Sequence, residues 1–158
     1  MGFGESDGCA MKYIMISRKF PKGHMNEGQR TRFVESILQG KKIHTIRGNA
    51  YRFSAGETVS LRVWDGQPYR SKQIEFAKVP IVRIEPLRLV RCSEGMRAYC
   101  GNRKISVFEL VENDGLTVPQ AISWFFGNKR LGEVFASIIH FTDFTYGIET
   151  TKAPRGGC

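Results

Sequence analysis

The 158-residue chain lacks any long apolar run. A helix that crosses a bilayer needs ~18 or more consecutive apolar residues, so the sequence argues against a membrane protein. The first ten residues are small, polar and slightly acidic, whereas a secretory signal needs a basic start followed by an apolar stretch. We therefore expect a cytoplasmic protein with no membrane partner.

Cysteine is scarce, with four residues. Cys92 and Cys100 are too far apart for a CxxC pair, and no second pair completes a zinc site. The other two, Cys9 and Cys158, lie in the predicted tails. We expect reduced thiols with no metal and no cofactor attached to them.

Histidine is rarer still, with three residues that have no nearby carboxylate partners in the sequence. His44 alternates with Thr45 in an extended segment, so we expect it to face away from that residue. His140 lies among apolar neighbours, which predicts a hydrogen-bonded structural residue, and His24 lies in a loop. No metal site is predicted from these side chains.

Positive charge is what the chain has in excess. The net charge is +9, and the segment from residue 18 to residue 52 alone carries nine basic side chains against two acidic ones. A one-sided positive field attracts phosphates, which points to a nucleotide or nucleic-acid partner. A basic, solvated face that serves only solubility is the alternative.

Apolar periodicity predicts an α+β domain of several short strands and two short helices. Gly40 is placed to end the first helix, and Thr117 with Gln120 forms a capping box for the second. We predict strands at 13–17, 43–47, 58–64, 71–84 (bent or bulged near 78–80), 87–91 and 133–146, helices at 31–39 and 117–126, an irregular loop at 93–103, and a strand or a helix at 104–111.

Strands of this spacing with helices between them suggest a small curled sheet or β-barrel with helices packed at its ends. We expect one domain over residues 11–149, with disordered tails at 1–10 and 150–158. No internal repeat is present, and we expect a monomer.

The segment Gly40-Lys-Lys-Ile-His-Thr-Ile-Arg47 carries the densest group of reactive side chains. Burial beside Lys41 and Arg47 would lower the pKa of Lys42, because both desolvation and like charge disfavour its ammonium form. A neutral lysine can act as a general base, with Thr45 as its nucleophile or as the residue that holds a water. A solvent-facing basic corner, with Thr45 selected for strand propensity, is the alternative.

This segment resembles the signature of the ASCH domain family, which belongs to the PUA-like superfamily. The resemblance rests on Ile37-Leu-Gln-Gly-Lys-Lys-Ile-His-Thr-Ile-Arg47, on Phe53-Ser-Ala-Gly-Glu-Thr-Val59, on the strand up to Trp64, on Asp114-Gly-Leu116 and on the closing strand to Phe144. It implies a small β-barrel with helices packed around a cleft, and an RNA-linked role.

The characterised enzymes of this family are small amidohydrolases that remove the acyl group from N4-acetylcytidine. By motif position, the resemblance implies that Lys42, Thr45 and Asp114 carry the reaction and that Arg47 binds substrate. Asp114 stands where those enzymes have a glutamate, which reaches one methylene further. The chain is also longer, with an added loop near its N-terminus and the segment 65–73.

The added segment 65–73 combines an aromatic ring with cations, a set that can stack on a base and hold a phosphate. We therefore predict Tyr69, Arg70 and Lys72 as further substrate-binding residues, unless this hairpin loop points away from the cleft. Trp64 and Trp124 could each stack on a base too, although Trp124 lies in an apolar helix and is expected in the core.

Two classes of function follow. The first is an amidohydrolase that acts on an N4-acylated cytidine-like substrate, either as a modified nucleoside or within RNA. The second is a module without catalysis, either an RNA-binding domain or a sensor of a free modified nucleotide. Convergence of Lys42, Thr45 and Asp114 in a narrow pocket favours the enzyme or the sensor, whereas an open basic groove favours RNA.

Overall fold

The computed structural model describes residues 10–48 and 50–147, in which eight strands and three helices form an α+β fold. The predicted tails lie outside the described residues, apart from Ala10. The elements are β1 (Tyr13–Met15), α2 (Phe33–Leu38), β2 (His44–Arg47), β3 (Thr58–Trp64), β4 (Gln73–Pro80), β5 (Arg83–Cys92), β6 (Gly95–Cys100), β7 (Arg103–Ile105), α3 (Val107–Asn113), α4 (Val118–Phe126) and β8 (Gly132–His140).

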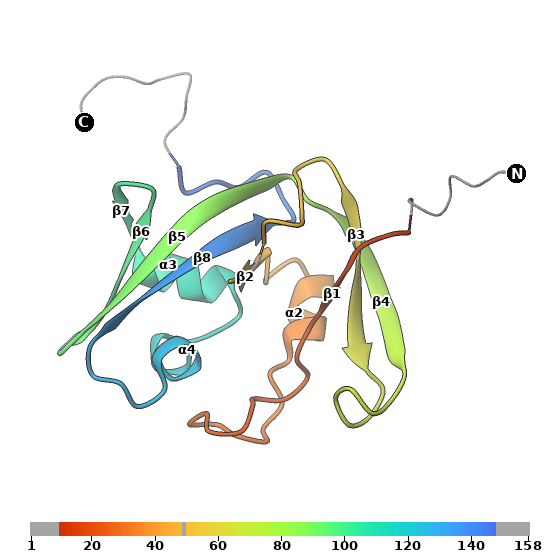
Figure 1. Ribbon diagram of the computed structural model, residues 1–158, viewed down its shortest axis with the longest axis horizontal. Coiled ribbons are helices and arrows are strands. Elements are labelled where there is room, and N and C mark those ends of the chain that lie inside the picture. Colours follow the sequence, from red (N-terminus) through yellow and green to blue (C-terminus); the bar gives the residue numbers. More distant parts are fainter. Residues whose placement is uncertain (1–9, 49, 148–158) are drawn as a thin grey trace, which may run out of the picture.

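The strands form two sheets. One has the order β1-β3-β4 and the other β2-β8-β5-β6-β7. In Figure 1 the three-stranded sheet lies to the right and the five-stranded sheet to the left, with α2 between them. Helices α3 and α4 contact each other and strands β6 and β8. Buried apolar side chains from both sheets and from all three helices form one core.

Three expectations that rest on short-range patterns are confirmed. Strand β3 has the predicted bounds, and Val59, Leu61 and Val63 are all buried because period-two alternation places these apolar side chains on the core face. Helix α4 begins with the predicted capping box, in which Thr117 and Gln120 exchange side-chain-to-backbone hydrogen bonds. Gly40 follows α2 with a φ of 77°, as a residue that ends a helix should.

The single strand predicted over 71–84 is wrong, because the chain leaves one sheet and enters the other at Ile81 and Val82. Ile81 is fully buried and exchanges backbone hydrogen bonds with Gly56 and Glu57. Ile81 continues the apolar run over residues 79–82, so the sequence shows no boundary there. The β-bulge lies opposite Leu61 and Arg62 rather than near residues 78–80.

The irregular loop predicted over 93–103 is also wrong, since most of it forms β6 and the start of β7. Met96, Ala98 and Cys100 are buried and alternate with more exposed neighbours. For residues 104–111 a strand or a helix was predicted, and the segment contains both. Strand β7 ends at Ile105 and α3 begins at Val107, with Ser106 as its N-cap. The last strand ends at His140 rather than at Tyr146.

The expected closed barrel is absent from the described residues, because β1 and β2 pair with different sheets. A side-chain hydrogen bond links these two strands, in which Arg47 Nη2 donates to the Met15 carbonyl at 2.7 Å. Four of the predicted site residues, Lys42, Thr45, Arg47 and Asp114, line a pocket at this seam between β1 and β2. None of the described helices is both long and apolar enough to span a membrane.

Candidate functional site

The end of α2 positions Lys42. The left-handed backbone of Gly40 turns the chain back, so that the N–H groups of Lys41 and Lys42 both donate to the Ser36 carbonyl, at 2.8 and 3.0 Å. The next backbone N–H, at Ile43, donates to the Asn113 carbonyl at 3.0 Å. Lys42 is thereby directed into the interior while Lys41 remains exposed.

The end of α3 positions Asp114. Its N–H donates to the Leu110 and Val111 carbonyls, and the next residue, Gly115, adopts a φ of 84°. Leu116 N–H then returns to the Val111 carbonyl at 2.8 Å, which completes a helix end. Asp114 is therefore held between α3 and α4, with its carboxylate and its carbonyl both directed at Lys42.

Lys42 and Asp114 form a buried ion pair. Lys42 Nζ donates to the Asp114 carbonyl at 2.7 Å and to Asp114 Oδ1 at 3.0 Å, and it lies 4.5 Å from the ring centre of Phe33. The two side chains are only 2% and 8% exposed. Breaking such a pair leaves an uncompensated buried charge, so neither partner can be lost without a large penalty.

Burial lowers the pKa of Lys42, as the sequence predicts, and the positive charge of Arg47 acts in the same direction. Asp114 opposes this effect. Burial would raise the pKa of Asp114, but the charge of Lys42 and the hydrogen bond from His44 outweigh it and hold that pKa below its ordinary value. Lys41 is exposed and plays no part in these shifts.

Thr45 lies on β2, opposite Ile139 of β8, and is buried. Its hydroxyl makes no hydrogen bond to any of the residues that the structure describes. It lines a pocket of about 70 Å³ whose wall also includes Lys42, Arg47 and Asp114. One buried water needs ~10–15 Å³, so the pocket has room for a few waters or one small polar group.

The structure thus brings together four of the predicted site residues. The rest of the pocket wall is apolar except for Ser17, and it includes Phe33 and Trp124. Trp124 also packs against Phe20 and His24, so it contributes to the core, as predicted, and to the pocket wall at once. Arg47 reaches Met15 with one nitrogen, while its Nε has no partner among the described residues.

Tyr69, Arg70 and Lys72 do not line this pocket. Tyr69 lines a second, larger hollow, while Arg70 and Lys72 are exposed and line neither of the two hollows. The hairpin carries these two cations outward because its turn is closed by backbone hydrogen bonds from Asp65 to Lys72 and from Arg70 to Gln67. The hairpin loop therefore points partly away from the pocket.

His44 is the residue that sequence reasoning undervalued. His44 lies on the other face of β2 from Thr45, as expected, but its side chain is fully buried there and reaches Asp114. His44 Nδ1 lies 3.2 Å from Asp114 Oδ1, and Nε2 lies 2.7 Å from the Tyr146 hydroxyl. An ionised carboxylate only accepts, so Nδ1 carries the proton and Nε2 accepts from Tyr146.

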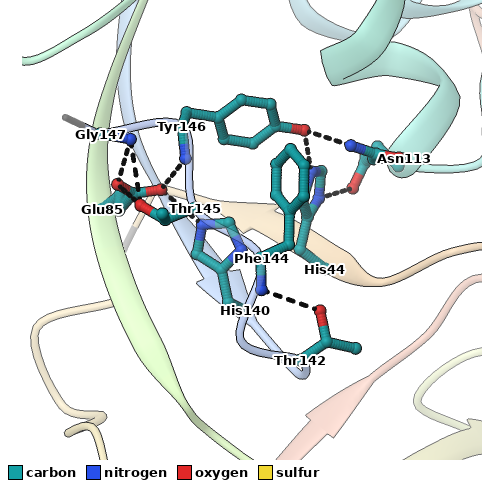
Figure 2. A network of polar contacts seen from close by, with 10 residues as sticks. His44, Glu85, Asn113, His140, Thr142, Phe144, Thr145, Tyr146 and Gly147 are labelled. Atoms are coloured by element: carbon teal, nitrogen blue, oxygen red, sulfur yellow. Dashed lines mark hydrogen bonds and ion pairs between the residues drawn. The ribbon is translucent and has the colours of Figure 1, made fainter. Parts of the chain in front are cut away.

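Asn113 completes this row of side chains by donating to the Tyr146 oxygen at 2.9 Å. Figure 2 shows Tyr146 reaching from the C-terminal end of the domain toward both Asn113 and His44. Burial raises the pKa of Tyr146, which keeps the phenol protonated and able to donate. A buried polar strand residue needs partners, and this was the signal by which His44 could have been found.

Glu85 holds Tyr146 in place. Its carboxylate accepts from His140 Nε2 at 2.7 Å, from the Thr145 hydroxyl at 2.6 Å, and from the N–H groups of Tyr146 and Gly147 at 3.0 and 2.8 Å (Figure 2). A Cβ on Gly147 would lie 2.7 Å from Glu85 Oε2, so only glycine permits this approach. His140 is hydrogen-bonded, as predicted, whereas no sequence pattern had pointed to Glu85.

We expect the free energy of unfolding to rise with pH between about 4 and 6.5. Burial lowers the pKa of His140 to about 4, so between these values the unfolded chain binds a proton that the folded chain excludes. The pKa of Glu85 also lies below its ordinary value and acts in the same direction, because the stabilisation from the ionised Glu85 carboxylate is lost as the pH falls through this pKa. The His140 contribution amounts to about 2 to 3 kcal/mol.

Urea unfolding at a series of pH values measures this slope. His140→Asn, which cannot titrate, should unfold with a flatter pH dependence than the unmodified protein. An identical slope in the two proteins would assign the acid sensitivity to other groups.

Gly115→Ala is expected to destabilise the protein by about 2 kcal/mol, since a left-handed backbone disfavours an L side chain. In addition, the new Cβ would lie 3.2 Å from Phe33 Cδ1 and 3.4 Å from Lys42 Cδ. Gly101→Ala is the matched control, because its φ is also positive, at 64°, and its Cβ meets nothing within 4 Å. Equal losses in urea unfolding would mean that the contact with Phe33 and Lys42 contributes nothing.

Comparison of the chain with protein-family models, with curated proteins and with solved structures finds no match. A function is therefore inferred from the pocket and from the side chains that line it.

Proposed function

We propose that the protein is an amidohydrolase that removes the acyl group from an N4-acylated cytidine-like substrate. One observation carries this proposal: Lys42, Thr45 and Asp114, the three residues at the motif positions, line a single small pocket, with Lys42 buried against Asp114. A purely structural role for the Lys42–Asp114 ion pair would not explain why the Thr45 hydroxyl lines the same pocket without a hydrogen-bond partner among the described residues.

We propose further that the fold is PUA-like, as an ASCH domain would be. The two sheets would correspond to a barrel that is left open at the seam between β1 and β2. The chain path supports this relation, because Ile81 bonds to the loop before β3 and the neighbouring Val82 N–H donates to the carbonyl of His140 at the end of β8. The pocket lies at the open seam, where Arg47 reaches Met15.

In the proposed reaction a nucleophile attacks the acyl carbon of the substrate. The nucleophile is the Thr45 hydroxyl or a water that this hydroxyl holds, and Lys42 in its neutral form takes the proton that is released. The carbonyl carbon becomes tetrahedral and its oxygen becomes an oxyanion. As the C–N bond breaks, the protonated Lys42 gives its proton to the departing cytidine amine.

If Thr45 is the nucleophile, its oxygen carries the acyl group after the amine has left. A water then attacks the acyl carbon, and Lys42 takes a proton from this water and gives it to the Thr45 oxygen as the carboxylic acid is released. Asp114 holds the Lys42 ammonium group through two hydrogen bonds while the proton resides there. Arg47 supplies a positive charge at the pocket wall, which would stabilise the oxyanion.

Thr45→Val tests this assignment, because valine keeps the shape of threonine and removes the hydroxyl. Purified protein is incubated with N4-acetylcytidine, and cytidine is measured by chromatography. We expect the variant to lose about 100-fold or more in rate. Thr58→Val, at an exposed position of β3, is the matched control. An unchanged rate for Thr45→Val would remove the hydroxyl from the mechanism.

A module that binds without turnover is the second candidate, favoured by the open hollow with basic side chains that adjoins the pocket. Such a module would bind RNA with an affinity that falls steeply with salt, by about 10-fold or more between 50 and 200 mM. It would release no cytidine under any condition. Turnover by the unmodified protein therefore decides between the two candidates.

A further inference from the structure

A second hollow adjoins the pocket and is about twelve times larger, at about 830 Å³. We call it the basic groove, and it is lined by residues 15–21, Arg30, Arg47 and residues 64–69. The two hollows share Ile16, Ser17 and Arg47. A ligand held in the pocket can therefore continue into the groove past Arg47.

The groove is cationic. Its lining contains four basic side chains, Arg18, Lys19, Arg30 and Arg47, and a single acidic one, Asp65. Arg30 is paired with Glu35 at 2.9 Å, whereas Arg18 forms no ion pair within the described residues and is held to the end of β3 by a hydrogen bond to the Trp64 carbonyl at 3.3 Å. An excess of positive charge in a concave surface attracts and concentrates phosphates.

The groove also presents an aromatic pair. The Trp64 and Tyr69 rings lie 5.1 Å apart, and Tyr69 is 87% exposed to solvent. Tyr69 is one of two non-glycine residues in the described chain with a positive φ, at 65°, a conformation that costs an L residue about 1 to 2 kcal/mol. An exposed ring held at such a cost suits a stacking surface for a base.

We infer that the substrate is single-stranded nucleic acid, in which one residue of the strand is the acylated cytidine and places its acyl group in the pocket. This inference rests on the proposed function. The neighbouring nucleotide lies in the basic groove, with its phosphate near Arg18 and Lys19 and its base on the Tyr69 ring. A mononucleotide has a single base, which stays at the pocket mouth because its acyl group lies in the pocket, so it would leave the aromatic pair without a ligand.

The first experiment compares kcat/KM for three substrates: a nine-nucleotide single-stranded RNA with one central N4-acetylcytidine, N4-acetylcytidine 5′-monophosphate, and the free nucleoside. At 50 mM salt we expect the RNA to be preferred over the nucleoside by about 10-fold or more. Equal values for the RNA and the nucleoside would overturn the inference, as would equal values for the RNA and the monophosphate.

The second experiment asks whether the preference arises in the groove. Arg18→Gln with Lys19→Gln should lower the ratio of the two kcat/KM values, RNA over nucleoside, by about 10-fold. Tyr69→Gly, which suits the positive φ and removes the ring, should lower it by about 5-fold or more. Lys129→Gln with Arg130→Gln makes the same change in net charge on an exposed turn between α4 and β8. An equal loss in this control pair would overturn the inference.

Binding keeps the test independent of catalysis. If no substrate is hydrolysed, the proposed function fails, and the fluorescence anisotropy of the same RNA with unmodified cytidine and a dye label then decides. A Kd that rises about 10-fold in the Arg18 and Lys19 variant, and not in the Lys129 and Arg130 variant, supports the groove as a nucleic-acid site. Absence of binding at 50 mM salt, or equal loss in both variants, overturns it.

Discussion

Replacing Lys42 with methionine is expected to lower the rate of N4-acetylcytidine hydrolysis by about 1,000-fold or more. Methionine fills a similar volume but can neither accept a proton from the nucleophile nor return it to the leaving amine. Because Asp114 and Thr45 remain in the pocket, the loss would report the proton transfer itself.

Folding must be separated from catalysis in this variant. Removal of Lys42 leaves the Asp114 carboxylate buried without its cation, which typically destabilises a protein by about 3 to 5 kcal/mol. Lys42→Met with Asp114→Asn removes both charges, so it should recover much of that stability in urea unfolding while staying inactive. A folded double variant that hydrolyses the substrate at the wild-type rate would show that neither residue acts in the reaction.

The pH profile gives a second readout of Lys42. Burial lowers its pKa from the ordinary value of 10.5, so the neutral base becomes available at lower pH than for an exposed lysine. The rate should rise with pH and reach half its maximum below pH 10.5. A rate that instead falls as the pH rises toward 10.5 would exclude Lys42 as the general base.

Glu85→Ala is expected to lower the free energy of unfolding by about 3 to 5 kcal/mol, a large share of the ~5–15 kcal/mol that holds a typical domain together. The change removes a carboxylate that accepts four hydrogen bonds and leaves the His140 ring and the N–H groups of Tyr146 and Gly147 without their acceptor. Urea unfolding followed by fluorescence measures the loss.

Glu133→Ala is the control for this change, since the Glu133 side chain is 45% exposed in its ion pair with Arg88 and should contribute less than about 1 kcal/mol. Glu85 touches neither Lys42 nor Thr45, so the variant that remains folded should keep most of its activity. Equal stability losses for Glu85→Ala and Glu133→Ala would contradict the role assigned to the Glu85 cluster.

Strands and helices with strong local signals were predictable. β3 alternates along its length and α4 carries its own capping box, so neighbouring residues decide both. The break at Ile81 was not predictable in this way, because Ile81 is apolar like Val79 and Val82 and the hydrogen bonds that end the strand come from the loop before β3. The same applies to β6, which exists because β5 pairs with it.

The residues of the candidate site also differ in whether the local sequence could predict them. Lys42, Thr45 and Arg47 lie within six positions, so a short motif places them on one corner of the chain. Asp114 is 72 positions from Lys42 and was found through the family resemblance alone. His44 and Tyr146 are 102 positions apart, and nothing in either local sequence indicates that they meet.

The sequence by itself determined the α+β class, the periodic elements, the positive charge of the first half and the motif from Gly40 to Arg47. Each of these depends on composition or on residues that are near neighbours along the chain. Only the tertiary structure decided that two sheets leave a seam between β1 and β2, that Asp114 and His44 meet there, and that a basic groove continues from the pocket. These features depend on which distant segments pack together, because burial and hydrogen bonding join side chains irrespective of their separation in the sequence.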